Sequence, residues 1–215
     1  MSNKPTTIYV VRHAQSGFNV GMDMKDYDSA LTEIGKQQTK QLSDELKVID
    51  FAVIYSSGLK RSKETAEILS NDRNLEVHID DSTNERSVYI YAEKIGIEYA
   101  DLEERITNEM KDLSGDQKMK FKYTPEMESA EEGAKRLENL FKKIANTHVG
   151  KTVLVISHGN LMRSFLTYIE YCEYDDLPTG AVKNTSYFIL KTDGEKFDLK
   201  ETHGIEKQKG KIRIW

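Results

Sequence analysis

TIYVVRH at residues 7–13 and TVLVISHG at residues 152–159 each begin with an apolar, largely β-branched run and lead into a histidine. Continuous apolar runs of this kind predict strands that are buried on both faces of a sheet. Elsewhere in the chain, segments with helical spacing of apolar residues alternate with further short apolar runs. We therefore expect both runs to lie in a parallel sheet.

The remaining pattern predicts four helices and further strands. The expected strands cover residues 7–11, 51–55, 75–79, 152–156, 185–190 and 197–202. The expected helices cover residues 31–49, 59–69, 130–146 and 160–171. Alternation of strands and helices predicts an α/β fold, a three-layer α/β/α arrangement with a mainly parallel central sheet.

Capping residues mark three of the expected helix starts. Thr32 and Ser57 are expected to cap the helices that follow them, and Ser129 with Glu132 fits a capping box. The polar stretch at residues 82–128 predicts loop with one helix over about 99–113. No Gly/Ser-rich linker divides the chain, so we expect one domain over residues 1–215 with an insertion or lid at about 85–128.

The composition excludes several classes of protein. The 215 residues carry a net charge of −5, which gives no support for nucleic-acid binding, and 38% of them are hydrophobic, as in globular domains. No apolar run approaches the roughly 18 residues needed to span a bilayer. The start of the chain lacks a secretory signal and Cys172 is the only cysteine, so we expect a cytoplasmic protein without membrane partners.

Polar side chains gather just after four of the expected strands. They are Arg12 with His13, Ser57 with Arg61, Glu85 with Arg86, and His158 with Gly159. Because the carboxyl ends of parallel strands lie along one edge of a sheet, we expect these side chains to meet in one crevice. A single histidine after a strand is more often a loop residue held by a backbone hydrogen bond, but four such placements favour a site.

Phosphoryl transfer is the chemistry that fits this set. Arginine side chains present planar donor forks to phosphate oxygens, and helix N-termini near Gly58 or Gly159 add backbone donors. A neutral imidazole is a nucleophile when its other nitrogen is held, and a carboxylate can protonate the leaving group. Paired histidines also suggest a metal, but neighbouring arginines disfavour a cation, so we expect neither metal nor cofactor.

Four motifs, in this order, resemble those of the histidine phosphatase (phosphoglycerate mutase-like) superfamily. They are RHAQSGFN at 12–19, LTEIG at 31–35, SGLKRSKETA at 57–66 and SHG at 157–159. The resemblance spans residues 8 to about 190 and implies the phosphoglycerate mutase-like fold. One departure is Ala14, which replaces the usual glycine and would cost about 1 kcal/mol if the position required a positive φ.

The resemblance also implies roles for individual residues. His13 corresponds to the nucleophile, and Arg12, Arg61 and His158 to the phosphate pocket. Glu85 falls where the family places its proton donor. Other acids in the same region are Glu93, Glu98 and Asp101, and further contacts to phosphate or substrate are expected from Ser16, Asn19 and Gly159.

The family contains phosphatases, mutases and inactive members. Cofactor-dependent phosphoglycerate mutases resemble one another in basic runs, Arg-His-Tyr-Gly and Gly-Leu-Asn-Lys, which residues 85–128 lack. Without that clamp we expect hydrolysis: a phosphomonoester hydrolase of the histidine acid phosphatase type, acting through a phosphohistidine on a small phosphorylated metabolite. A cofactor-dependent mutase and a phosphate-binding pseudo-enzyme or interaction protein stay open as alternatives, as does a homodimer.

Overall fold

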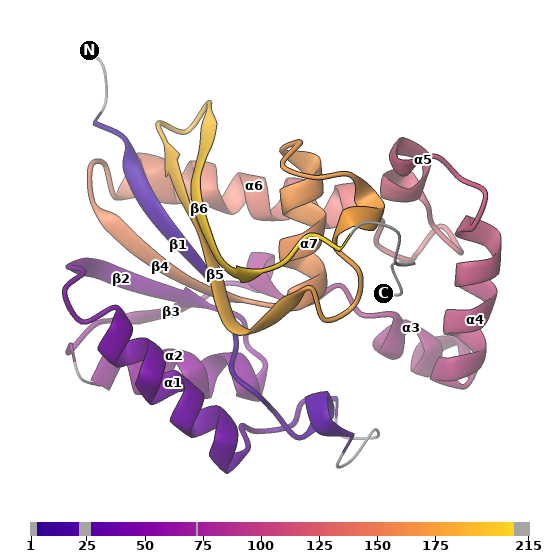
Figure 1. Ribbon diagram of the computed structural model, residues 1–215, viewed down its shortest axis with the longest axis horizontal. Coiled ribbons are helices and arrows are strands. Elements are labelled where there is room, and N and C mark those ends of the chain that lie inside the picture. Colours follow the sequence, from indigo (N-terminus) through magenta and orange to yellow (C-terminus); the bar gives the residue numbers. More distant parts are fainter. Residues whose placement is uncertain (1–3, 22–26, 72, 209–215) are drawn as a thin grey trace.

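The computed structural model describes residues 4–21, 27–71 and 73–208, and these form six strands in one sheet (Figure 1). The strands are β1 Thr6–Arg12, β2 Phe51–Ser56, β3 Val77–Ile79, β4 Thr152–Ser157, β5 Val182–Thr192 and β6 Phe197–Ile205. Their order across the sheet is β3-β2-β4-β1-β5-β6. Strands β1, β2, β3 and β4 pair in parallel with their neighbours among these four. Strand β5 pairs antiparallel with β1 and with β6, so the predicted mainly parallel sheet is confirmed.

Helices cover both faces of this sheet, which confirms the three-layer arrangement (Figure 1). They are α1 Glu33–Glu45, α2 Lys60–Asn71, α3 Val88–Ile95, α4 Tyr99–Met110, α5 Gly115–Lys120, α6 Ala130–Thr147 and α7 Gly159–Tyr168. Short 3-10 turns occupy Phe18–Val20, Asp81–Thr83 and Tyr174–Asp176.

Successive residues of β1 belong to opposite layers, as strand geometry requires. Val10 lies in the apolar cluster that contains Phe141 of α6 and the inner face of α7. Val11 lies in the cluster that contains Leu42 of α1 and Leu69 of α2. The central strand is therefore buried on both faces, which explains its continuous apolar run.

The insertion between β3 and α6 forms its own small helical layer, α3 to α5, beyond the end of the sheet (Figure 1). These helices pack around a third apolar cluster that includes Leu102 and Ile106. The prediction of one helix over about 99–113 is wrong in number, because α3 and α5 also form. Each has a serine cap: the Ser87 hydroxyl accepts from Ile90 N–H, and Ser114 opens a capping box.

Two predicted caps are confirmed and one is wrong. Thr32 accepts from Gly35 N–H at the start of α1, and Ser129 forms the expected capping box with Glu132 at the start of α6. Ser57 does not cap α2, because its hydroxyl is bonded to His158. The Lys60 N–H at the start of α2 donates instead to Asp28 over 2.6 Å.

No helix within the described ranges has both the length and the apolar character needed to cross a bilayer.

Candidate active site

Strands β1 and β4 bring the two motif histidines together. The strands are parallel neighbours in which Arg12 pairs with Ser157, so His13 and His158 follow them at the same edge of the sheet. The His13 N–H donates to the Ser157 carbonyl oxygen over 3.0 Å, and the two imidazole centroids lie 5.0 Å apart. Only 2% of His13 and 0% of His158 is exposed, so both rings are shielded from bulk water.

Hydrogen bonds fix the tautomer of His13. Its Nδ1 lies 2.7 Å from the Ala14 carbonyl oxygen, which can only accept, so Nδ1 carries the proton. Its Nε2 accepts from Nε of Arg61 over 3.2 Å. Burial, followed by the charges of Arg61 and Arg12, lowers the pKa of His13 well below 6.5 and keeps the ring neutral at pH 7. His13 therefore presents an unprotonated Nε2, as a nucleophilic imidazole must.

Arg61, on the first turn of α2, is held in place from the opposite side of the cavity. Only 2% of the residue is exposed. One Nη donates to the Tyr27 carbonyl oxygen over 2.5 Å, and the guanidinium carbon lies 4.8 Å from the centre of the Tyr27 ring. These contacts order the guanidinium before any ligand arrives, which reduces the entropy cost of binding an anion.

His158 is oriented by Ser57, whose Oγ lies 2.7 Å from its Nε2. Its Nδ1 is buried and has no hydrogen-bond partner among the residues that the structure describes. Burial, followed by the charges of Arg61, His13 and Arg12, lowers the pKa of His158 well below 6.5. When the Ser57 hydroxyl donates to Nε2, the neutral ring carries its proton on Nδ1, and this N–H can donate a hydrogen bond to a ligand.

Arg12 also has a buried donor that nothing in the described chain satisfies. One Nη donates to the Val182 carbonyl oxygen over 2.6 Å, while Nε is buried and without a partner in those residues. Burial is the main cause that lowers the pKa of Arg12, with Arg61 adding to it and Glu85 opposing it. Unsatisfied buried donors are costly, and a tetrahedral oxyanion is the kind of group that would satisfy both Arg12 and His158.

Glu85 lies at the same edge, against the N-terminus of α7. Its carboxylate accepts from Asn160 N–H over 3.1 Å, from Leu161 N–H over 3.0 Å and from Arg86 N–H over 2.9 Å. It lines the same cavity as His13, whereas the alternative acids do not line it. These alternatives, Glu93, Glu98 and Asp101, are exposed on the insertion.

A cavity of about 70 Å³ opens above His13. Its lining includes Arg12, Arg61 and Glu85 together with aromatic side chains from two separate segments of the chain. The rings of Tyr27 and Tyr89 are stacked, with centroids 5.6 Å apart and an interplanar angle of 6°. Tyr27 of the N-terminal loop and Tyr89 of α3 thus meet at the cavity wall.

The remaining predicted contacts divide into two groups. Asn19 lines the cavity, and its Oδ1 accepts from the Ser16 N–H over 3.2 Å. Ser16 is fully buried and donates its hydroxyl to the same oxygen, so it shapes the loop and does not line the cavity. Gly159 does not line the cavity either: a Cβ there would lie 3.3 Å from Nε of Arg12. Its lack of a side chain gives that guanidinium room.

Two residues that hold the site together were not predicted from the sequence. Asn184 donates through Nδ2 to the His13 carbonyl oxygen over 3.0 Å and to Asn19 Oδ1 over 3.1 Å. Tyr27 supplies both the carbonyl oxygen and the ring that hold Arg61. Nothing in the sequence marks Asn184, because only the antiparallel pairing of β5 with β1 brings it to the site.

Ala14, the departure from the expected motif, carries no backbone strain. It is fully buried, its φ is negative, and its N–H donates to the Thr65 hydroxyl over 3.2 Å. An alanine adopts such a conformation freely, so the cost considered for a positive φ does not arise.

No cluster of three or more metal-ligating side chains occurs in residues 4–21, 27–71 and 73–208.

This arrangement has a counterpart among known proteins. Residues 8–203 match the family model of the histidine phosphatase superfamily (branch 1), and the chain belongs to that family. It is a phosphomonoester hydrolase whose chemistry passes through a phosphohistidine.

Curated relatives and solved structures resemble most of the chain. A protein of Bacillus subtilis named "Uncharacterized phosphatase PhoE" is 29% identical over 197 residues, which are 91% of this chain and 93% of the relative. A "Putative phosphoserine phosphatase 2" of Hydrogenobacter thermophilus is 27% identical over 193 residues, 89% of this chain and 92% of the relative. The solved structure of YhfR from Bacillus stearothermophilus is 25% identical, with a TM-score of 0.73 over 94% of this chain and 100% of that one.

Proposed function

We propose that this chain is a metal-independent histidine acid phosphatase in which Nε2 of His13 attacks the phosphorus of a small phosphomonoester. One observation carries the proposal: the buried His13 has its Nδ1 proton held by the Ala14 carbonyl oxygen, and its unprotonated Nε2 accepts from Nε of Arg61. This is the state of an imidazole prepared for nucleophilic catalysis.

In the first step the Nε2 lone pair forms the N–P bond as the bond between phosphorus and the leaving oxygen breaks. Glu85, protonated at this stage, donates its proton to the leaving oxygen, so that an alcohol departs. In the second step Glu85 takes a proton from water, the hydroxide oxygen bonds to phosphorus, and the N–P bond breaks. Inorganic phosphate and neutral His13 are the products.

Charge on the transferring phosphoryl group is offset by groups that surround it. The guanidinium of Arg61, Nε of Arg12 and Nδ1 of His158 are the donors assigned to its oxygens. Asn19 at the cavity wall is assigned as a further donor. Because these groups are already ordered by protein contacts, they need little reorganisation during the reaction.

The acid-phosphatase assignment is supported by the lowered pKa of His13. Since burial and Arg61 disfavour the imidazolium, the nucleophile stays unprotonated at pH values where a solvated histidine is protonated. Activity is therefore expected to persist below pH 6.5.

The substrate is proposed to be small, and phosphoserine is the first compound to test. The cavity beside His13 has a volume of about 70 Å³, which favours a phosphomonoester with a compact leaving group. Relatives are named as phosphoserine phosphatases. Arg86, a cation of the cavity wall, donates to the Glu128 carbonyl oxygen and to Ser164, which limits its use as a second phosphate clamp of the kind that a mutase needs. Cytoplasmic location and a homodimer stay predictions.

The test is hydrolysis of p-nitrophenyl phosphate and phosphoserine in EDTA, with acid-labile phosphate on the protein measured after a denaturing quench. His13→Ala should lower kcat by at least about 10³-fold and abolish the labelled intermediate. Activity that needs added metal, or undiminished activity in His13→Ala, contradicts the proposal. Conversion of 3-phosphoglycerate after priming by 2,3-bisphosphoglycerate would instead identify a mutase.

A further inference from the structure

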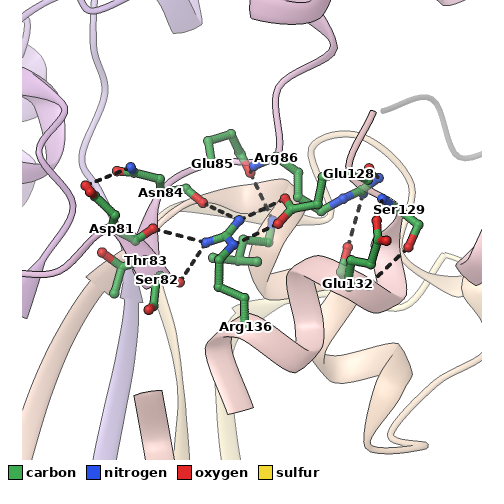
Figure 2. A network of polar contacts seen from close by, with 12 residues as sticks. Asp81, Ser82, Thr83, Asn84, Glu85, Arg86, Glu128, Ser129, Glu132 and Arg136 are labelled. Atoms are coloured by element: carbon green, nitrogen blue, oxygen red, sulfur yellow. Dashed lines mark hydrogen bonds and ion pairs between the residues drawn. The ribbon is translucent and has the colours of Figure 1, made fainter. Parts of the chain in front are cut away.

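Arg136, on the second turn of α6, joins the two ends of the insertion (Figure 2). At the exit end, Nε donates to one carboxylate oxygen of Glu128 over 2.8 Å and Nη2 to the other over 2.9 Å. This is the bidentate geometry in which the guanidinium plane and the carboxylate plane fix each other.

At the entry end, the same guanidinium donates to three backbone carbonyl oxygens just before Glu85. Nη1 lies 2.7 Å from the oxygen of Ser82 and 3.3 Å from that of Asp81, and Nη2 lies 3.1 Å from that of Asn84. Figure 2 shows the guanidinium between this turn and Glu128. One side chain therefore contacts both the segment leading into Glu85 and the exit end of the insertion.

Arg86, on the other side of Glu85, is anchored to the same helix. Its side chain crosses α6 at Gly133, where a Cβ would lie 2.6 Å from Cδ of Arg86. Its Nη2 donates to the Glu128 carbonyl oxygen over 3.1 Å, and its Nη1 to Ser164 over 3.3 Å. Glu85 thus lies between two neighbours whose positions are set from α6 and α7.

We propose that Arg136 is a positioning residue that holds the Glu85 carboxyl within reach of the leaving oxygen. This rests on the proposed function, in which Glu85 transfers the proton. The Arg136 and Glu128 side chains are 25% and 34% exposed, and their bidentate pairing contributes to stability as well. The contacts to three carbonyl oxygens before Glu85 go beyond that pair and point to placement of that residue.

The experiment uses leaving groups that differ in their need for a proton. A nitrophenolate departs without protonation, whereas the serine alkoxide of phosphoserine requires it. Glu85 also takes the proton from water in the second step, which both substrates share, so the readout is kcat/KM, which reports the first step alone. Arg136→Met should lower kcat/KM on phosphoserine about 10- to 100-fold while changing kcat/KM on p-nitrophenyl phosphate less than about 3-fold, since general acid catalysis contributes 10²- to 10⁴-fold. Arg136 does not line the cavity, so this loss should not come from weaker substrate binding.

Three further variants calibrate this readout. Glu85→Gln should lose more activity on phosphoserine than Arg136→Met does, and again little on p-nitrophenyl phosphate. Arg136→Lys retains the charge but not the planar fork, so part of the activity on phosphoserine should return. If Arg136→Met does not fold, Arg136→Lys should still fold and serves for the same comparison. Lys122→Met is the matched control, because Lys122 pairs with Glu132 over 3.0 Å near the same helix start without contacting the turn before Glu85.

The results distinguish a failure of the positioning role of Arg136 from a failure of the proposed function. Equal loss on both substrates in the Arg136 variants, or no loss on either, overturns the positioning role while Glu85→Gln keeps its selectivity. Loss of selectivity in Glu85→Gln itself removes Glu85 as the proton donor and the positioning role with it. A wild-type protein that hydrolyses neither substrate overturns the proposed function before Arg136 is considered.

Discussion

The carbonyl oxygen of Gln15 lies where a side chain on Gly35 would begin: a Cβ at Gly35 would be 2.0 Å from that oxygen. The same oxygen accepts from the Thr32 N–H over 3.0 Å, and the Thr32 hydroxyl donates to the Gln15 side chain over 2.7 Å. The loop that follows His13 is thus fastened to the first turn of α1. This contact explains why the LTEIG motif ends in glycine.

Gly35→Ala is therefore expected to shift the loop that carries His13. The clash is with backbone on both sides, so no rotamer relieves it, and overpacking of this kind costs about 1–3 kcal/mol or more in the free energy of unfolding. Urea unfolding should show the loss, and kcat/KM should fall with it. Gly115→Ala is the matched control: its nearest contact, Cβ of Tyr174, is 3.6 Å away, so the variant should be as stable as the wild type. Equal stability of the two variants would contradict this account.

The centre of the site was predicted from the sequence. The reason is local: Arg12 ends β1, His13 and His158 directly follow β1 and β4, and these two strands are neighbours. The partners that orient them were not predictable in the same way. Asn184 reaches His13 through antiparallel pairing, and Tyr27 meets Tyr89 only because the insertion folds back over the loop. These contacts depend on tertiary geometry for which no spacing in the sequence is diagnostic.

The insertion shows where periodicity fails. α3 has only eight residues, and apolar residues lie on its exposed face (Ile90 and Ile95) as well as on its buried face (Val88, Tyr91 and Ala92), so the buried stripe cannot be told apart in the sequence. Its boundaries are set by Ser87 at the start and by Gly96, with a φ of 70°, at the end. A capping search would have found this helix where a periodicity search did not.

The pH dependence of activity should follow His13. Its lowered pKa means that protonation, and loss of the nucleophile, occurs well below pH 6.5. NMR titration of the ligand-free protein, with His13→Gln to assign the resonance, should show an imidazole that is still neutral at pH 6. A midpoint at or above 6.5 would contradict the buried, arginine-flanked environment.

Stability should respond to pH through both buried histidines. Their pKa values are lowered in the folded state, so between the folded and unfolded values the unfolded chain binds more protons. The stabilising contribution of the neutral rings is present above about pH 6.5 and is lost as the pH falls below it. The unfolding temperature in phosphate-free buffer should therefore fall between pH 6.5 and 5, and less steeply in His13→Gln. Identical slopes would contradict this prediction.

Ser57→Ala should impair catalysis by releasing His158. The substitution leaves Nε2 of a fully buried ring without its partner at 2.7 Å, at a cost of about 1–3 kcal/mol in the free energy of unfolding. The tautomer that places a proton on Nδ1 is no longer favoured, so kcat should fall. Ser56→Ala removes a buried hydroxyl that bonds to Ser62 over 2.9 Å and not to the histidine. It should lose stability but keep kcat, and a comparable fall in kcat would contradict the role of Ser57.

Asn184→Ala should loosen the loop from His13 to Asn19, because one amide holds oxygen atoms at both ends of it. Loss of the two hydrogen bonds, one of them partly buried, costs about 0.5–1.5 kcal/mol each, so kcat/KM for p-nitrophenyl phosphate should fall by about 10-fold. Asn184→Asp retains the shape but replaces a donor with an acceptor facing two oxygens, and should be at least as damaging. The neighbouring Lys183 is exposed and pairs with Glu206 over 2.6 Å, so Lys183→Ala should retain full activity. If Asn184→Ala matches that control, the His13 loop does not depend on β5 for its position.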